Sequence, residues 1–198
     1  MWPIDGVVGE NGGFYFRMND HKLERRFRVD EQTRAANRAR LAVIREEVLR
    51  RFPTAGLASD QPYRELDLAI DFCEDVPPLP LEAVDEIVAI FEKHGATAKI
   101  SSIHVNGWFG EYDKLSMCRT YLAEVHGKDL DRERERYFFA GDSPNDEPMF
   151  AFFPNAVGVA NIRRFASRLR HPPAYVTASE GGAGFAELVD AILGVRRK

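Results

Sequence analysis

The stretch Tyr137-Phe138-Phe139-Ala140-Gly141-Asp142-Ser143-Pro144-Asn145-Asp146 is the most informative part of the sequence for the fold. Its apolar start predicts a short strand, and its glycine, proline and asparagine residues predict a loop directly after that strand. Further short strands are predicted at 157–159 and 174–176, with a helix before the first of them and a closing helix over 185–193. Strands that alternate with helices predict a parallel, doubly wound sheet in an α/β fold.

The sequence before residue 110 has a different pattern. In chain order it predicts a hairpin at 7–16, a helix at 31–52, a strand at 66–72, a helix at 84–91 that ends at Gly95, and a strand at 97–105. Residues 66–72 alternate between apolar and polar, which predicts one buried and one polar face. This order predicts an α+β unit of about 100 residues, with an antiparallel or mixed sheet that helices cover on one side.

Composition excludes several classes of protein. The 198 residues carry a net charge of −4, which argues against a dedicated nucleic-acid-binding protein. The arginine-rich helix at 31–52 is therefore interpreted as a solvated outer face, with nucleic-acid binding as the weaker alternative. Two cysteines fit a reducing, cytoplasmic setting. We find no apolar run long enough to span a membrane and no secretory signal at the N-terminus.

The loop after the 137–140 strand carries the candidate chemistry. Asp142 and Asp146 follow the end of a predicted parallel strand, where doubly wound sheets bind their ligands. Such hard oxygen ligands suit Mg²⁺. Lys114 begins a predicted helix at 114–126, one helix–loop–strand unit earlier, so we expect it at the same end of the sheet, where it could neutralise a bound phosphate. The alternatives are a helix-capping turn for the loop and an ordinary surface position for the lysine.

These residues resemble a known family. Lys114 together with 139–146 resembles the third and fourth motifs of the haloacid dehalogenase (HAD) phosphohydrolase superfamily. Residues 158–161 and 174–177 are similar to its sugar-phosphatase branch with a large C2-type cap, the Cof-like and sucrose-phosphatase-like enzymes, and Glu10-Asn11-Gly12 resembles the turn that leads into that cap. The resemblance implies a HAD-like core over 1–10 and 111–198 and an α+β cap over 11–110.

The resemblance also implies roles for single residues. Asp142 would bind Mg²⁺ directly, and Asp146 would complete the acidic cluster through water or by holding Lys114. Lys114 would balance charge on the nucleophile and the phosphoryl group. Asn145, with Ser143, would orient the loop, and Asn161 would lie near the substrate. The reaction in this family proceeds through an aspartyl-phosphate intermediate.

One departure from the family pattern affects the expected activity. The first motif, Asp-X-Asp-X-Thr or Asp-X-Asp-Gly-Thr, and the second, a strand-ending Ser or Thr, are absent from these 198 residues. Two readings follow, an enzyme shortened at its N-terminus or a non-catalytic binding or regulatory remnant. In the family the missing strands are central, so we expect an exposed apolar edge at 137–140. We also expect that this chain alone does not hydrolyse phosphate esters.

The predicted cap offers candidate substrate contacts. Ser102, His104 and Asn106 share one face of the last predicted cap strand and could face a phosphate. The alternative for His104 is a strand histidine bonded within the sheet. Trp108 and Phe109 suggest either a hinge whose aromatic ring stacks on a sugar or packing between cap and core. The expected substrate is a sugar phosphate or similar small phosphorylated metabolite, with no nucleic-acid or membrane partner, and the oligomeric state stays open.

Overall fold

The computed structural model describes residues 3–196, and the chain divides into two compact units, Met1–Cys118 and Arg119–Lys198. The first unit holds two antiparallel sheets, and the second holds a parallel sheet. The division into a core of 1–10 and 111–198 and a cap of 11–110 stays a prediction. Among the described residues, no helix combines the length and the apolar character that crossing a bilayer requires.

The first sheet is a three-stranded antiparallel meander. It consists of β1 (Val7–Gly9), β2 (Phe14–Asn19) and β3 (Lys22–Phe27). The predicted hairpin at 7–16 is confirmed, because Val8 pairs with Tyr15. The sequence analysis missed β3, whose residues are mostly charged. Its register is set by the turn at Asp20 and His21, which both have positive φ and so match the twist of a two-residue hairpin.

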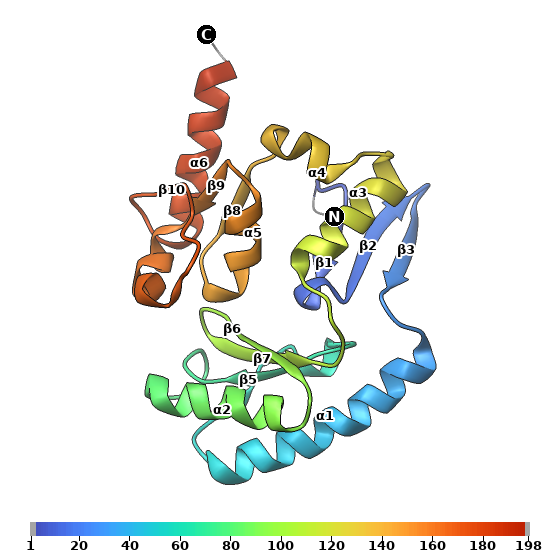
Figure 1. Ribbon diagram of the computed structural model, residues 1–198, viewed down its shortest axis with the longest axis vertical. Coiled ribbons are helices and arrows are strands. Elements are labelled where there is room, and N and C mark those ends of the chain that lie inside the picture. The colour runs from blue at the N-terminus through green and yellow to red at the C-terminus, as the bar shows by residue number, and fades with distance from the viewer. Residues whose placement is uncertain (1–2, 197–198) are drawn as a thin grey trace. The chain divides into compact units, whose positions relative to one another are not determined.

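The second sheet of the first unit has the order β4-β5-β7-β6, and all of its neighbours are antiparallel. Its strands are β4 (Gly56–Leu57), β5 (Leu68–Asp71), β6 (Thr97–Ile100) and β7 (His104–Trp108). Helices α1 (Glu31–Arg51) and α2 (Leu81–Lys93) lie on one side of this sheet (Figure 1). The predicted helices and the helix-covered antiparallel sheet are therefore confirmed.

Apolar side chains at helical spacing explain why α1 and α2 pack on this sheet. Leu41, Ile44 and Val48 of α1 are buried in one cluster with Ile87 of α2 and Ile70 of β5. Burying side chains of this size stabilises the fold by about 1.5–3 kcal/mol each. The helix begins where the Asp30 side chain accepts a hydrogen bond from the Thr33 backbone N–H at 2.8 Å.

Two predictions for this sheet are wrong in detail. The predicted polar face of 66–72 is buried, since Asp67 is 3% exposed and Asp71 is fully buried. The carboxylates tolerate burial because each accepts several hydrogen bonds, as described below. The single strand predicted at 97–105 is two antiparallel strands, β6 and β7, which leaves Ser102 outside both. The connection is tight, with the Ser101 backbone N–H donating to the His104 carbonyl at 2.8 Å.

The aromatic residues at the end of β7 have packing roles. Trp108 is 1% exposed, and its ring stacks on Tyr112 with 5.7 Å between centroids. Phe109 belongs to the buried cluster of the first unit, and the Arg40 guanidinium lies 3.4 Å from its ring centroid. These contacts favour packing over stacking on a sugar for both rings. Helix α3 (Lys114–His126) then begins and ends as predicted.

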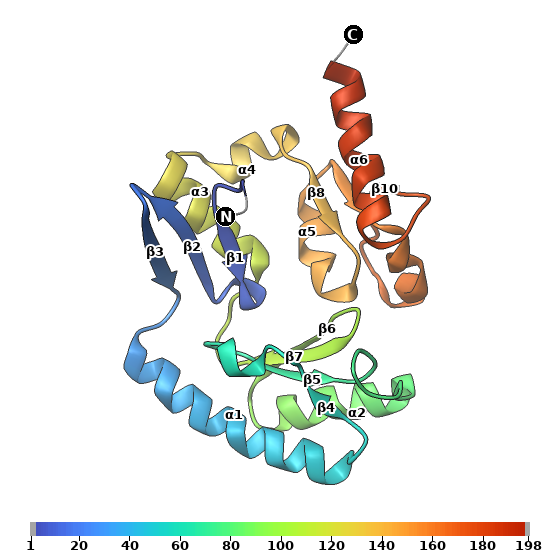
Figure 2. The same ribbon diagram turned by 180° about the vertical axis from the view of Figure 1, so that it is seen from behind.

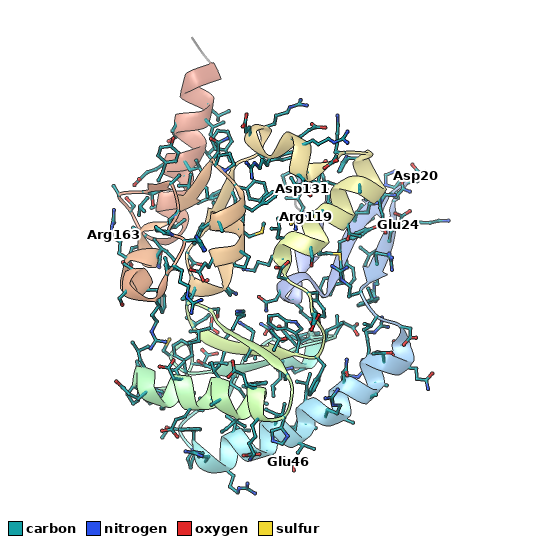
Figure 3. The ribbon with its side chains drawn as sticks, viewed as in Figure 1. Asp20, Glu24, Glu46, Arg119, Asp131 and Arg163 are labelled. Atoms are coloured by element: carbon teal, nitrogen blue, oxygen red, sulfur yellow. The ribbon has the colours of Figure 1, made fainter. Side chains whose placement is uncertain are left out.

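The second unit is built on a parallel sheet of order β10-β9-β8. Its elements are α4 (Leu130–Glu133), β8 (Phe139–Gly141), α5 (Glu147–Phe152), β9 (Ala156–Gly158), β10 (Tyr175–Val176) and α6 (Gly181–Arg196). Figures 1 and 2 view this sheet from opposite sides and show α5 on one side and α6 on the other. The predicted doubly wound parallel arrangement is confirmed. An ion pair of 2.8 Å between Arg119 and Asp131 ties α3 to α4 (Figure 3).

An apolar face of the second unit is open to solvent. The exposed apolar side chains of this unit come from the strand ends and from α6: Phe138, Tyr175, Val176, Phe185, Val189 and Leu193. A groove of about 640 Å³ runs between β10 and α6 and is lined by residues of both. The exposed edge predicted at 137–140 is confirmed for Phe138, which is 55% exposed, while its neighbours in that stretch are half-buried.

Candidate functional site

The acidic loop at residues 141–146 is held together by its own side chains. Oδ2 of the buried Asp146 accepts a hydrogen bond from the Asp142 backbone N–H at 3.0 Å. The Ser143 hydroxyl lies 2.6 Å from Asn145 Oδ1 and 3.3 Å from Asp146 Oδ2, and its single proton can be donated to either oxygen. These bonds give the loop one defined shape directly after β8.

Gly141 lets the loop fold back on the end of the strand. A Cβ atom at this position would lie 2.6 Å from Asp146 Oδ2, so a larger residue would push the carboxylate away. The Gly141 carbonyl accepts a hydrogen bond of 2.8 Å from the Val159 backbone N–H, which ties the loop to the end of β9. The loop therefore lies at the carboxyl end of a parallel sheet, as predicted.

The donor atoms of the loop fit a hard divalent cation. Asp142 and Asp146 provide carboxylate oxygens and Asn145 provides an amide oxygen, the ligand types that Mg²⁺ prefers. Asp146 Oδ2 lies within hydrogen-bonding distance of the Asp142 backbone N–H and the Ser143 hydroxyl, and the Asp142 side chain is half-buried. Metal binding by Asp142 and Asp146 stays a prediction.

Asn161 has a structural contact in the second unit. Its Oδ1 accepts a hydrogen bond of 2.7 Å from the Gly181 backbone N–H, the first residue of α6. Thr177 also makes structural hydrogen bonds to the backbone. Its hydroxyl accepts from the Ala160 N–H at 3.1 Å and donates to the Ser179 carbonyl at 2.8 Å. Both side chains shape the loops after β9 and β10, and the substrate role of Asn161 stays a prediction.

Lys114 begins α3 in the first unit, where a glycine turn supports it. The Asp113 side chain caps the helix by accepting from the Ser116 backbone N–H at 2.7 Å. Gly12 has φ of +97°, and a Cβ there would lie 2.0 Å from the Asp113 carbonyl oxygen. The turn at Glu10–Gly12 is therefore packed against the residue before Lys114. The acidic loop belongs to the second unit, and the meeting of Lys114 with that loop stays a prediction.

Cys118, one turn after Lys114, is unsuited to nucleophilic catalysis. Burial raises the pKa of its thiol to about 11, against the smaller opposing effect of the nearby Lys114 ammonium. The thiolate is the reactive form of cysteine, and this environment disfavours it.

A buried carboxylate cluster in the first unit was missed by the sequence analysis. Glu10 Oε1 accepts from the Glu65 backbone N–H at 2.7 Å, and Oε2 accepts from those of Leu66 and Asp67 at 2.5 and 3.0 Å. Burial, and then the nearby Asp67 carboxylate, raise the pKa of Glu10 to about 7 despite these three bonds. Burial likewise raises the pKa of Asp67, although Arg64 pairs with it at 3.0 Å.

The predicted cap contacts lie within or beside this network. Asn106 Oδ1 accepts a hydrogen bond of 3.4 Å from Arg64 Nη1, so its side chain faces the cluster of Arg64 and Asp67. His104 is 7% exposed, and its Nε2 lies 2.9 Å from Glu74 Oε2. Both side chains lie close to charged neighbours in their own unit, and their predicted roles as substrate contacts stay predictions. Glu10 stood in the turn that resembled the family, which was the only sequence signal for the buried cluster.

Comparison with solved structures identifies the fold. The sucrose-phosphatase of Synechocystis sp. PCC6803, solved with sucrose and phosphate, matches with a TM-score of 0.60 at 15% identity, over 96% of this chain and 74% of its own. Protein 0175 of Thermoplasma acidophilum matches with a TM-score of 0.59 at 22% identity, over 96% of this chain and 73% of its own. A trehalose-6-phosphate phosphatase related protein matches with a TM-score of 0.56 at 13% identity, over 98% and 74%.

At these identities the likeness shows the fold alone. No protein-family model matches the sequence, and no curated protein matches it significantly. The predicted fold class, a HAD-like α/β fold with a parallel sheet and helices, is confirmed. Substrate, metal and mechanism do not follow from the comparison.

Proposed function

We propose that this chain is part of a Mg²⁺-dependent phosphohydrolase of the HAD type. It would act on a sugar phosphate or a similar small phosphorylated metabolite through an aspartyl-phosphate intermediate, with the nucleophilic aspartate outside these 198 residues. The observation that carries the proposal is the acidic loop at the carboxyl end of β8, whose shape is maintained by the Asp142 N–H bond to Asp146. The HAD-like fold that the chain shares with two phosphatase-related structures supports it.

Each loop residue has a distinct task in this proposal. Asp142 binds Mg²⁺, and Asp146 holds the loop through its bonds to the Asp142 N–H and the Ser143 hydroxyl. Bound Mg²⁺ neutralises charge on the phosphoryl group and orients it. Lys114 contributes a second positive charge to the phosphoryl oxygens, because a fixed cation stabilises the charge that develops there during transfer. Asn145 keeps the carboxylates oriented, and Asn161 borders the substrate.

The first unit would supply the cap and with it substrate selection. Sugar phosphates carry hydroxyl groups, which need hydrogen-bonding partners in a site that excludes water. The proposal expects such partners on the cap, with His104 and Asn106 as the predicted positions. No membrane or nucleic-acid partner is invoked, and the expected location is the cytoplasm.

Binding of Mn²⁺, a spectroscopic probe for Mg²⁺, tests the metal part of the proposal. We would titrate the 198-residue chain with Mn²⁺ in the presence of inorganic phosphate and follow free Mn²⁺ by electron paramagnetic resonance. Asp142→Asn should weaken Mn²⁺ binding at least about tenfold. Removing a residue that only hydrogen-bonds to a metal ligand already weakens metal binding about 10–100-fold, and removing the ligand itself should weaken it at least as much. Asp190→Asn, an exposed aspartate of α6, is the matched control. Equal binding by both variants would refute the loop as the metal site.

Turnover distinguishes the enzyme from its alternative, a non-catalytic binding or regulatory protein. The 198-residue chain with Mg²⁺ should not hydrolyse a generic aryl phosphate, because it carries no Asp-X-Asp-X-Thr segment to provide the nucleophile. Turnover that Asp142→Ala abolishes would contradict this expectation. A strand-ending Asp-X-Asp encoded in frame upstream of Met1 would favour the enzyme, and a stop codon close upstream would favour the alternative.

A further inference from the structure

Three potential metal ligands converge at one end of the β5–β7 pair in the first unit. Asp71 is the last residue of β5 and pairs in register with His104, the first residue of β7. Residues directly opposite each other on antiparallel strands project their side chains to the same face of the sheet. Glu74 follows in the loop after β5. One ligand atom from each of Asp71, Glu74 and His104 lies within 4.8 Å of the other two.

The Asp71 carboxylate is held rigidly and retains capacity for a further ligand. Its Oδ1 accepts hydrogen bonds from the backbone N–H groups of Cys73 and Glu74 at 2.9 and 2.8 Å. Its Oδ2 accepts one bond of 2.8 Å from the Asp75 backbone N–H. Each carboxylate oxygen can accept two bonds, so Oδ2 keeps one position open. Carboxylates that bind metals are commonly oriented by such hydrogen bonds.

The His104 side chain provides an independent indication of a ligand. It is 7% exposed, and its Nε2 is buried without a hydrogen-bond partner. Glu74 Oε2 lies 2.9 Å away, but the contact does not have the geometry of a hydrogen bond. A buried, unpartnered ring nitrogen costs free energy unless something binds it. This nitrogen lies on the side of the ring that approaches Glu74.

We propose that Asp71, Glu74 and His104 bind a divalent transition-metal ion of the Zn²⁺ type. An imidazole nitrogen combined with carboxylate oxygens is a ligand set that Zn²⁺ accepts with three protein ligands and a further open position. Mg²⁺ prefers oxygen ligands throughout, which separates this site from the acidic loop of the second unit. The proposed ion joins the end of β5, its following loop and the start of β7. It would take the His104 side chain that the proposed function lists as a substrate contact, so His104 would then reach the substrate only through the ion.

Isothermal titration of the metal-free 198-residue chain with Zn²⁺ tests the proposal. We expect one saturable site that His104→Gln and Glu74→Gln each weaken at least about tenfold. The matched control is His94→Gln, because His94 Nε2 lies 2.7 Å from a single carboxylate, Glu47, whose other oxygen pairs with Lys93 at 2.8 Å. This control should bind Zn²⁺ as the unchanged chain does. Far-ultraviolet circular dichroism checks the fold, and the exposed Glu74 is the substitution least able to disturb it.

Substitution of Co²⁺ for Zn²⁺ supplies a second readout. The visible absorption of bound Co²⁺ should change in His104→Gln and should stay the same in His94→Gln, because only the former removes a nitrogen ligand. Zn²⁺ binding that is unaffected by His104→Gln, or that is lost in Asp142→Asn instead, would overturn the proposal. The second of these results would assign the ion to the acidic loop.

Discussion

Stability against pH is the most direct test of the buried cluster around Glu10. The pKa of this carboxyl group is raised from 4.5 to about 7. A shift of this size corresponds to a difference of about 3 kcal/mol between its protonated and ionised forms in the folded chain. Below pH 4.5 the group is protonated in both the folded and the unfolded state. Between pH 4.5 and 7 only the folded state keeps the proton.

The sign of the effect follows from this difference in bound protons. Stability that depends on protonated Glu10 is fully present below pH 4.5 and is lost as the pH rises through 7. The raised pKa of Asp67 acts in the same direction. Carboxylates with lowered pKa values, such as Glu47 at about 2, have the opposite effect, but only at more acidic pH. The free energy of unfolding of the first unit should therefore fall between pH 4.5 and 8.

The assay compares the unchanged chain with Glu10→Gln, in which the titrating group is removed. Urea unfolding would be followed by the fluorescence of Trp108, which is buried in the first unit and reports its unfolding. Between pH 4.5 and 8 the free energy of unfolding should decrease in both chains. The decrease should be smaller in Glu10→Gln than in the unchanged chain, by up to about 3 kcal/mol. Glu111→Gln, a change at an exposed glutamate, is the control and should leave the pH profile unaltered.

A constant offset between the two curves is expected and does not affect the test. In Glu10→Gln, the amide NH₂ group replaces one of the two oxygens that accept hydrogen bonds from the backbone N–H groups. Each N–H group left without an acceptor costs about 1–3 kcal/mol at every pH. The informative quantity is the slope. If Glu10→Gln and the unchanged chain show parallel profiles from pH 4.5 to 8, the reasoning about burial and the Asp67 charge is wrong.

Two glycine substitutions, Gly12→Ala and Gly141→Ala, test turns next to candidate site residues, and a third, Gly127→Ala, is their control. Gly12→Ala should destabilise the first unit by at least about 2 kcal/mol in urea unfolding, because φ is +97° and the new Cβ would lie 2.0 Å from the Asp113 carbonyl oxygen. Gly127→Ala, at φ +62° with open space around it, should cost only the backbone strain of about 1 kcal/mol. Gly141→Ala should displace Asp146, whose Oδ2 would be 2.6 Å away, cost about 1.5–3 kcal/mol and weaken Mn²⁺ binding. Mn²⁺ affinity unchanged in Gly141→Ala would argue against the loop as its site.

Elements with strong periodicity could be predicted from the sequence, and elements defined by local hydrogen bonding could not. The helical spacing of Leu41, Ile44 and Val48 predicted α1. The apolar residues of β8, followed directly by glycine, proline and asparagine, predicted a strand of the parallel sheet. Strand β3 was missed because its residues are mostly charged and do not have the apolar alternation of a strand. Its stability comes from the turn at Asp20 and His21 and from pairing with β2. The break between β6 and β7 was missed because residues 97–105 contain no glycine or proline to mark the turn at Ser101 and Ser102.

The candidate site divides in the same way. The acidic loop was recognisable because Asp142 and Asp146 follow a strand at a fixed spacing. The alternation at 66–72 is real, but the polar face that it predicts is buried at Asp67, because a sequence does not reveal that Arg64 and Asn11 satisfy a buried carboxylate. The proximity of Asp71 to His104 depends on strand register, which residue types alone left undetermined.

The open apolar face of the second unit bears on how firmly the acidic loop is maintained. Strands β8 and β9 have three residues each and β10 has two, and side chains such as Phe138 and Tyr175 remain largely in water. Because its strands are short and part of its apolar surface stays exposed, the backbone amides of this unit should exchange hydrogen sooner than those of the first unit. An ion that binds only the ordered loop would slow this exchange across the whole unit, because its binding free energy adds to the free energy of opening.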